Sequence, residues 1–414
     1  MLPSSGRLHR HSGKPITLAA LGWMFLRIAC TSFGGFMTMV SAVQNTVVER
    51  RKLLSDRDVL DGLSLASVLP GPIAINVVAY LGYRLRGVAG AAVSVIAAVL
   101  PACVLMILLA IAYFRWGQVP AVGKVFMGMT PAVAAVVAAA AWRMCCTAAT
   151  GVREGLQAAG AVLAMLAFTG AYVTPCVMLV SAVTGCFMFG ASARRESVAA
   201  SAIKPVLNDK PDSLPQVPAS HIINHLLALA TPTSMASLAS LEPLMLTKLF
   251  YVFAGLSMAM FGGGYVFVPM LQQVMVEGHG WVTRQEFVDA VALGQITPGP
   301  VMISATFVGL KVAGISGALA ATAGMFAPPA ALMVLCARLL SGVGKSPWVK
   351  AALRGVRAAT AGMVCVAAVE IGKSAAPSWP SVVLFLSMLI AQLRYRIEAV
   401  WLIPVAGLAG WLVY

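Results

Sequence analysis

Charged residues are scarce in this sequence. Only 10% of its 414 residues are Asp, Glu, Lys or Arg, and just 14 of them are acidic. A soluble domain normally carries about 25% charged residues, so the composition excludes an ordinary soluble protein. Hydrophobic residues make up 60% of the chain, and the mean hydropathy is +0.88. Several apolar runs exceed the ~20 residues that a helix needs to cross hydrocarbon. The sequence therefore predicts an all-α, polytopic membrane protein.

Metal-binding and redox patterns are also lacking. The eight cysteines show no metal-ligand or redox spacing, and the adjacent Cys145 and Cys146 cannot form an unstrained disulfide. The five histidines lie in predicted tails and loops. A membrane reductase would need a redox cofactor or a paired-thiol motif. We therefore expect no metal, no cofactor and no enzymatic activity.

Basic residues outnumber acidic ones, 29 to 14, which gives a formal charge of +15. Because they lie mostly between apolar runs, they indicate loops held on the cytoplasmic side rather than a nucleic-acid surface. We expect the lipid bilayer as a partner, no nucleic acid, and the inner (plasma) membrane as location. Residues 1–15 form a basic cytoplasmic tail, and the apolar run behind them is a first span rather than a cleaved signal peptide.

The chain contains an internal repeat. Two Pro-Gly-Pro motifs lie 228 positions apart, and two Phe-Gly-Gly motifs precede them at the same offset. After a one-residue slip, Gly82 and Gly87 match Gly309 and Gly314 at an offset of 227. Such sustained self-similarity predicts two copies of one membrane unit. We expect the units at 16–190 and 248–414, with a linker at 191–247 that includes an interfacial helix.

Each Pro-Gly-Pro motif should break a helix inside the membrane. Proline has no backbone N–H group and disfavours helix in the residue before it. A simple kink is the alternative to a full break. Broken helices at membrane depth are tolerated only within protein or beside a water-filled cavity, and transporters use them as substrate sites. Their free N–H groups suit an anion.

The expected architecture has about ten spans, within a range of 10–12. The distribution of basic residues favours an inverted repeat, although Arg194 and Arg195 in the linker argue against the odd span number that inversion requires. The apolar stretch from Gln157 to Gly190 predicts either two short helices or a tight hairpin.

The repeated motifs, together with Gly82-Tyr83-Arg84 after the first break, resemble the chromate ion transporter family in its long, two-unit form. The resemblance covers nearly all of the chain except the tails and the linker. It implies a secondary transporter that exports chromate. The sequence departs from the family pattern at Ser67, where Gln is usual, at Ser304, where Thr is common, and at Leu310, where an aromatic residue is common. These departures bear on the substrate more than on the fold.

We expect chromate or a related oxyanion to bind between the two units. The candidate substrate-binding residues are Phe33, Gly34, Gly35, Pro70, Gly71, Pro72, Asn76, Arg84, Phe261, Gly262, Gly263, Gln295, Pro298, Gly299, Pro300 and Lys311. Arg84 and Lys311 have an alternative role as loop anchors that reach the membrane interface.

Three charges within apolar runs, Arg27, Asp61 and Asp289, are candidates for the transport pathway or for ion coupling. Arg143 and Glu370 occupy equivalent positions with opposite charge, which suggests an ion pair across the interface of the units. The alternative functions are export of a sulfate-like anion or another small metabolite, and a membrane scaffold without transport. A homodimer is the expected form if the chain self-associates.

Overall fold

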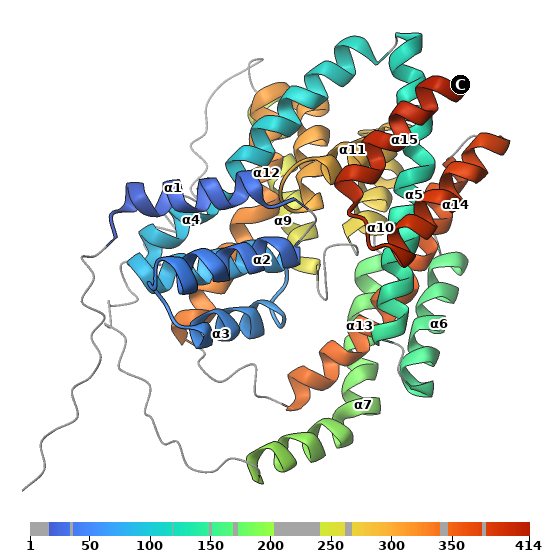
Figure 1. Ribbon diagram of the computed structural model, residues 1–414. Coiled ribbons are helices and arrows are strands. Elements are labelled where there is room, and N and C mark those ends of the chain that lie inside the picture. Colours follow the sequence, from blue (N-terminus) through green and yellow to red (C-terminus); the bar gives the residue numbers. More distant parts are fainter. Residues whose placement is uncertain are drawn as a thin grey trace, which may run out of the picture.

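Helices are the only regular structure in the residues that the computed structural model describes, which confirms the all-helical prediction (Figure 1). The described residues are 16–33, 36–117, 119–148, 151–168, 173–202, 241–260, 267–339, 347–374 and 378–414. The predicted Phe-Gly-Gly glycines and most of the predicted linker lie outside them.

The first unit has these elements, where η marks a π- or 3-10 helix: α1 (Leu18–Thr31), α2 (Phe36–Gln44), η1 (Asn45–Arg50), α3 (Asp56–Ala66), α4 (Ile73–Trp116), α5 (Pro120–Ala148), α6 (Val152–Ala167) and α7 (Val173–Ala202). The stretch from Gln157 to Gly190, for which the sequence predicted either two short helices or a tight hairpin, is occupied by two helices, α6 and α7. The second unit contains α9 (Leu241–Ala259), α10 (Phe267–Gln272), η3 (Gln273–Gly278), α11 (Arg284–Ile296), η4 (Val301–Ile303), α12 (Ser304–Leu339), α13 (Pro347–Ser374), α14 (Trp379–Arg394) and α15 (Ala399–Val413).

The repeat extends to details of the backbone. The two π-helices, η1 and η3, start and end 228 positions apart. Helices α3 and α11 both begin with a capping box, in which the N-cap hydroxyl and the carboxylate three residues later bond to each other's backbone N–H groups. Glycines with positive φ recur at Gly87 (φ 64°) and Gly314 (φ 63°).

Those glycines turn the chain sharply inside α4 and α12, so each of these elements consists of two helices. The φ and ψ angles of 64° and −154° at Gly87 lie in a region that only glycine adopts readily. The two parts of α4 then approach so closely that a Cβ atom on Gly90 would lie 2.3 Å from the carbonyl oxygen of Gly82. Gly309 and Gly317 make the equivalent contact in α12.

The last helices of each unit cross over to the other unit. Helices α6 and α7 pack on α13, whereas α14 and α15 pack on α5. The crossings need small residues, because a Cβ on Gly128 would lie 2.6 Å from Cα of Gly410 and one on Gly355 would lie 2.7 Å from Cα of Gly185. Figure 1 shows these six helices as one group, the crossover bundle, on the side opposite α1, α2 and α3.

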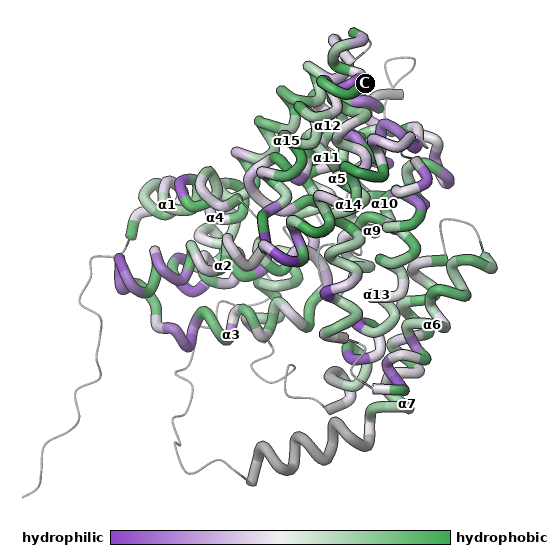
Figure 2. The backbone as a smooth tube through the Cα atoms, turned by 45° about the vertical axis from the view of Figure 1, so that its right-hand side comes forward, coloured by the Kyte–Doolittle hydropathy of each residue, from purple (hydrophilic) through white to green (hydrophobic). Residues whose placement is uncertain are grey.

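Among the described residues, four helices are long and apolar enough to cross a membrane by length and composition: α4, α5, α12, and Ala351–Lys373 within α13. Five apolar segments of 10–17 residues accompany them, including α1, α14 and α15. Figure 2 shows hydrophobic colour along most of the bundle and polar colour near the start of α3. About ten crossings would require the shorter helices as well, so that number stays a prediction, as does the inverted orientation.

Candidate functional site

The two Pro-Gly-Pro breaks lie at the interface of α4 and α12 and pack reciprocally. A Cβ atom on Gly71 would lie 2.3 Å from Cβ of Pro329 in α12, and one on Gly299 would lie 3.5 Å from Cβ of Ala102 in α4. Gly299 is the repeat equivalent of Gly71, and Pro329 is that of Ala102. Each break therefore contacts the same position in the other unit, as a pseudo-two-fold axis requires.

Both motifs are full breaks rather than kinks. Helix α3 ends at Ala66 and α4 begins at Ile73, while α11 ends at Ile296 and α12 follows a 3-10 turn. The glycines have φ angles of +96° at Gly71 and +121° at Gly299, which side chains disfavour. The Gly71 N–H group donates to the carbonyl of Met260, at 2.8 Å. Met260 directly precedes the second Phe-Gly-Gly motif, so the first break meets the chain that leads into that motif.

The breaks leave polar groups without partners in the protein interior. No side chain caps α4 at Pro72, so the first backbone N–H groups of this buried helix end lack a capping side chain. The Nδ2 of Asn76 donates to the carbonyl of Pro70 at 2.9 Å, which holds the break closed on itself. Among the described residues, its Oδ1 and the Nε2 of Gln295 are buried and have no partner. Gln295 therefore offers a free donor, whereas the donor of Asn76 is engaged.

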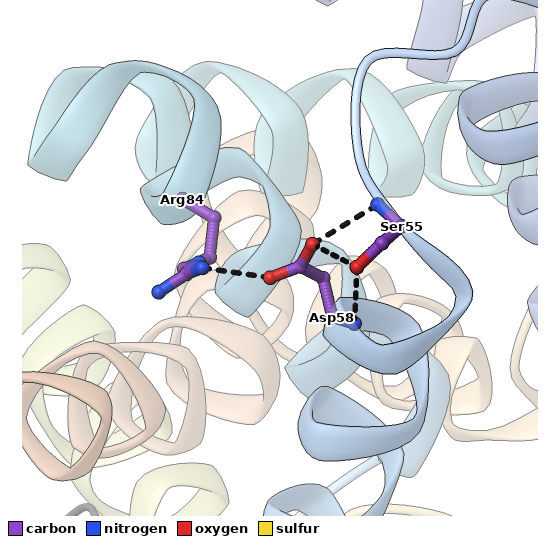
Figure 3. A network of polar contacts seen from close by, with 3 residues as sticks. All are labelled: Ser55, Asp58 and Arg84. Carbon is purple, nitrogen blue, oxygen red and sulfur yellow. Dashed lines mark hydrogen bonds and ion pairs between the residues drawn. The ribbon is translucent and has the colours of Figure 1, made fainter. Parts of the chain in front are cut away.

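Arg84 and Lys311 each form an ion pair in this structure, which agrees with their alternative role as anchors. Arg84 Nη2 lies 2.7 Å from Oδ1 of Asp58, the capping-box residue of α3 (Figure 3). Lys311 pairs with Glu286, the equivalent residue of α11. Each of these basic side chains thus links the part of α4 or α12 that precedes its sharp turn to the helix before the break. Their charges are compensated here, and their role in substrate binding stays a prediction.

The capping carboxylates are held in their ionised form. Burial would raise the pKa of Asp58, but hydrogen bonds from Ser55 and the charge of Arg84 outweigh it, and the pKa is lowered from its ordinary value of 3.8. Burial would likewise raise the pKa of Glu286, but hydrogen bonds from Lys311 and Thr283 outweigh it, and the pKa is lowered from its ordinary value of 4.5. The repeated anchor is therefore charged at neutral pH.

A second polar cluster surrounds Asp289 on α11. Its carboxylate is 2% exposed and accepts hydrogen bonds from the Tyr113 hydroxyl of α4 at 2.8 Å and from Gln285 Nε2 at 3.0 Å. Gln285 also donates to Thr130 of α5 at 3.2 Å. Within the described parts of the chain, no basic side chain forms an ion pair with Asp289. This cluster joins α4, α5 and α11 around a carboxylate that is costly to ionise.

The comparisons with known proteins agree with the repeat. A model of the chromate transporter family matches residues 19–186 and 247–411. The chain belongs to the chromate transporter family. It is 30% identical to the "Probable chromate transport protein" of Synechococcus elongatus, over 99% of this chain and 98% of that protein.

Two further relatives carry the name "Chromate transport protein". The one from Cupriavidus metallidurans is 29% identical, over 98% of this chain and 95% of that protein. The one from Pseudomonas aeruginosa is 27% identical, over 97% and 93% respectively. No solved structure matches the chain. Because the family consists of transporters and not enzymes, the chain is a multi-pass membrane transporter.

Several predicted site residues of this chromate transporter family member lie apart from the breaks. Arg27 has an exposed side chain on the face of α1 opposite its buried residues, so it does not line the protein interior. Asp61 is exposed, unlike its equivalent Asp289. Phe33 is 37% exposed next to the undescribed glycines of its motif.

The predicted interface pair is not formed in this transporter structure. Glu370 accepts from Arg284 at 3.4 Å and from Lys373 at 2.7 Å. Arg143 is exposed, and no acidic group of the described residues lies within ion-pair distance of it. The opposite charges at equivalent positions therefore need another explanation.

Sequence reasoning missed Tyr113, Thr130 and Gln285. Their partners are far away in the sequence, since 176 positions separate Tyr113 from Asp289. The available signal was a tyrosine at the end of a predicted span, which is also typical of a membrane-interface anchor.

Proposed function

We propose that this transporter exports chromate or a related tetrahedral oxyanion across the inner membrane by alternating access. The observation that carries the proposal is the reciprocal packing of the two Pro-Gly-Pro breaks at the α4–α12 interface. Transporters of several folds bind substrate between repeats, at the ends of discontinuous helices. The names of the relatives support chromate as the substrate.

In this proposal, the anion is bound mainly by backbone N–H groups. The uncapped end of α4, at Ile73 and Ala74, offers donors and the positive end of the helix dipole. The unpartnered Nε2 of Gln295 adds a side-chain donor from the second unit. Asn76 positions the first break by its bond to Pro70. The undescribed glycines Gly34, Gly35, Gly262 and Gly263 remain part of the proposed site on sequence grounds.

We assign ion coupling to Asp289 rather than to Asp61 or Arg27. A buried carboxylate without a basic partner is favoured in its neutral form, so it can bind a proton in one state and release it when water reaches it. Asp61 and Arg27 are exposed and lack this property in the present state. Asp289→Asn should keep the hydrogen bonds in part while removing the titration. A variant that still transports with an unchanged pH profile would exclude Asp289 from coupling.

The proposal is tested with inverted membrane vesicles and radiolabelled chromate or sulfate. Export from the cell corresponds to uptake into such vesicles, and cells expressing the protein should gain chromate resistance. Uptake of sulfate alone would favour the sulfate-like alternative. Absence of uptake for both, with the protein present in the inner-membrane fraction, would favour another metabolite or a scaffold. Light scattering on the purified protein tests the predicted homodimer.

A further inference from the structure

The two units differ in how they contact the crossover bundle. In the second unit, α11 packs against α5, α13 and α15, and α10 packs against α13. In the first unit, the equivalent helices α2 and α3 pack on α4, and α3 also touches α12. Within the described residues, α2 and α3 have no extensive contact with the bundle. Figure 1 shows α2 and α3 on the left, apart from the crossover bundle on the right. The sequence repeat is symmetric, but this docking is not.

The same helix face is buried in one unit and exposed in the other. On α11, Val288 is 1% exposed and Asp289 is 2% exposed. Their equivalents on α3 are Leu60, which is 58% exposed, and Asp61, which is also exposed. The next position of this face, Ser64, is exposed as well. Helix α3 thus presents to its surroundings the surface that α11 uses for docking.

At the docking contact, each unit has one acidic and one basic residue. In the second unit the base is on the docking helix and the acid on the bundle, whereas in the first unit the acid is on the docking helix and the base on the bundle. Arg284 at the start of α11 pairs with Glu370 of α13. The repeat equivalents of these residues are Asp56 at the start of α3 and Arg143 near the end of α5. An acid and a base have exchanged places, so an ion pair remains available. Both side chains are exposed here, and Asp56 accepts a hydrogen bond from Gln44 at 2.7 Å.

We propose that Asp56 and Arg143 are positioning residues for the other end state of the transport cycle, in which α3 docks on the bundle as α11 does here. The inference rests on the proposed transport by alternating access, but not on chromate as the substrate. Two equivalent units around one axis can exchange their conformations, so the unit that is docked in one state is released in the other. This explains why Arg143 and Glu370 carry opposite charges at equivalent positions. Glu370 pairs with the basic Arg284 in the present state, and Arg143 pairs with the acidic Asp56 in the other state.

The remaining charges near this contact are compatible with docking. The repeat equivalents of Gln285 and Thr130, which bond across α11 and α5, are Arg57 of α3 and Arg357 of α13. Both are exposed, and docking would bring them together with Asp61, the equivalent of Asp289. An acid between two bases offsets their repulsion. Asp61 therefore has a role in the second state, as a charged partner rather than a neutral one.

Cysteine cross-linking tests the contact in a cysteine-free full-length chain in native membranes. The pair Asp56→Cys with Arg143→Cys should form a disulfide under mild oxidation, although the two side chains are not in contact here. Arg284→Cys with Glu370→Cys is the positive control for the present state. Ser64→Cys with Arg143→Cys is the matched negative control, because Ser64 lies two turns further along α3, about 12 Å.

The expected result is cross-linking of the first pair at least fivefold above the Ser64 control, with loss of transport that a reducing agent reverses. Cross-linking no faster than that control, while the Arg284–Glu370 pair reacts, would overturn the inference. This readout needs no substrate. If cross-linking occurs but neither chromate nor sulfate is carried, the docking stands and the substrate proposal fails.

Charge exchange provides a second test that does not depend on disulfide geometry. Asp56→Arg and Arg143→Glu should each slow transport several-fold, since each places like charges at the contact. The double variant has the charge order of Arg284 and Glu370 and should return to within twofold of the wild type. If the transport rate of the double variant were reduced by the product of the two single reductions, a direct contact between the two positions would be contradicted.

Discussion

Replacement of Gly71 by alanine should be far more damaging than the same change at Gly299, although the two residues are repeat equivalents. Both glycines have positive φ angles, +96° and +121°, and a side chain there costs about 1–3 kcal/mol. At Gly299 the added Cβ would lie 3.5 Å from Ala102, an ordinary contact. At Gly71 it would lie 2.3 Å from Cβ and 2.8 Å from Cγ of Pro329.

The overlap with Pro329 adds to the backbone cost, because a proline ring cannot rotate away and the helices must separate. Overpacking of this kind costs about 1–3 kcal/mol. We therefore expect Gly71→Ala to lower the free energy of unfolding by about 2–6 kcal/mol and Gly299→Ala by about 1–3 kcal/mol. Denaturant titration in detergent measures the stability, and chromate uptake into inverted vesicles measures the function.

A second-site variant separates the overlap from the backbone cost. Pro329→Gly removes the clashing ring atoms and should return part of the stability and uptake of Gly71→Ala. Pro328→Gly, one position away on α12, is the matched control and should return neither. The steric reasoning would be refuted if Gly71→Ala unfolded no more easily than Gly299→Ala, or if both proline variants rescued it equally.

Three further outcomes are expected. Gly90→Ala should destabilise α4 strongly, as the new Cβ would lie 2.3 Å from the Gly82 carbonyl oxygen; an unfolding midpoint equal to that of the wild type would contradict the close approach. Arg84→Ala should cost no more than about 1 kcal/mol in denaturant titration, since the pair with Asp58 is partly exposed. The pKa of Asp58 is lowered from 3.8, so its stabilisation should be complete above that pH and be lost as the pH falls through the folded value; Asp58→Asn should flatten this acid limb, and an unaltered limb would be the contrary result.

The sequence predicted the parts of the fold that depend on local chemistry. Two prolines around a glycine interrupt a helix wherever they occur, so both breaks lie where the motifs indicated. The constant offset identified equivalent residues before any contact was known, including the positive-φ glycines Gly87 and Gly314. The bounds of the linker stay a prediction; α7 extends to Ala202 and α9 begins at Leu241, so both helices reach into the predicted linker.

Long-range partners could not be predicted in the same way. Arg84 and Asp58 are 26 positions apart, and their equivalents Lys311 and Glu286 pair as well, yet spacing alone did not separate a paired base from an anion ligand. The sequence also did not predict that the last helices of each unit pack against the other unit. A helix that fits its own unit fits the equivalent surface of the other unit, so local pattern does not decide between them.

The difference in burial between Asp61 and Asp289 shows most clearly what could not be predicted from the sequence. The residue type, the helix and the distance to the following break are the same, so these features do not distinguish the two residues. Only the docking of α11 on the bundle buries one carboxylate and leaves the other exposed. Under the proposed exchange of conformations between the units, this asymmetry belongs to the conformational state rather than to the local sequence.

The most direct measurement of the central claim is chromate flux into proteoliposomes that contain the purified protein. The account predicts that the wild type carries chromate well above the rate of protein-free liposomes. It also predicts that Gln295→Leu, which removes the unpartnered donor beside the second break, remains folded but transports at least tenfold more slowly. Equal flux for the wild type and Gln295→Leu would contradict an anion site at the breaks, and no flux for the wild type would contradict chromate transport itself.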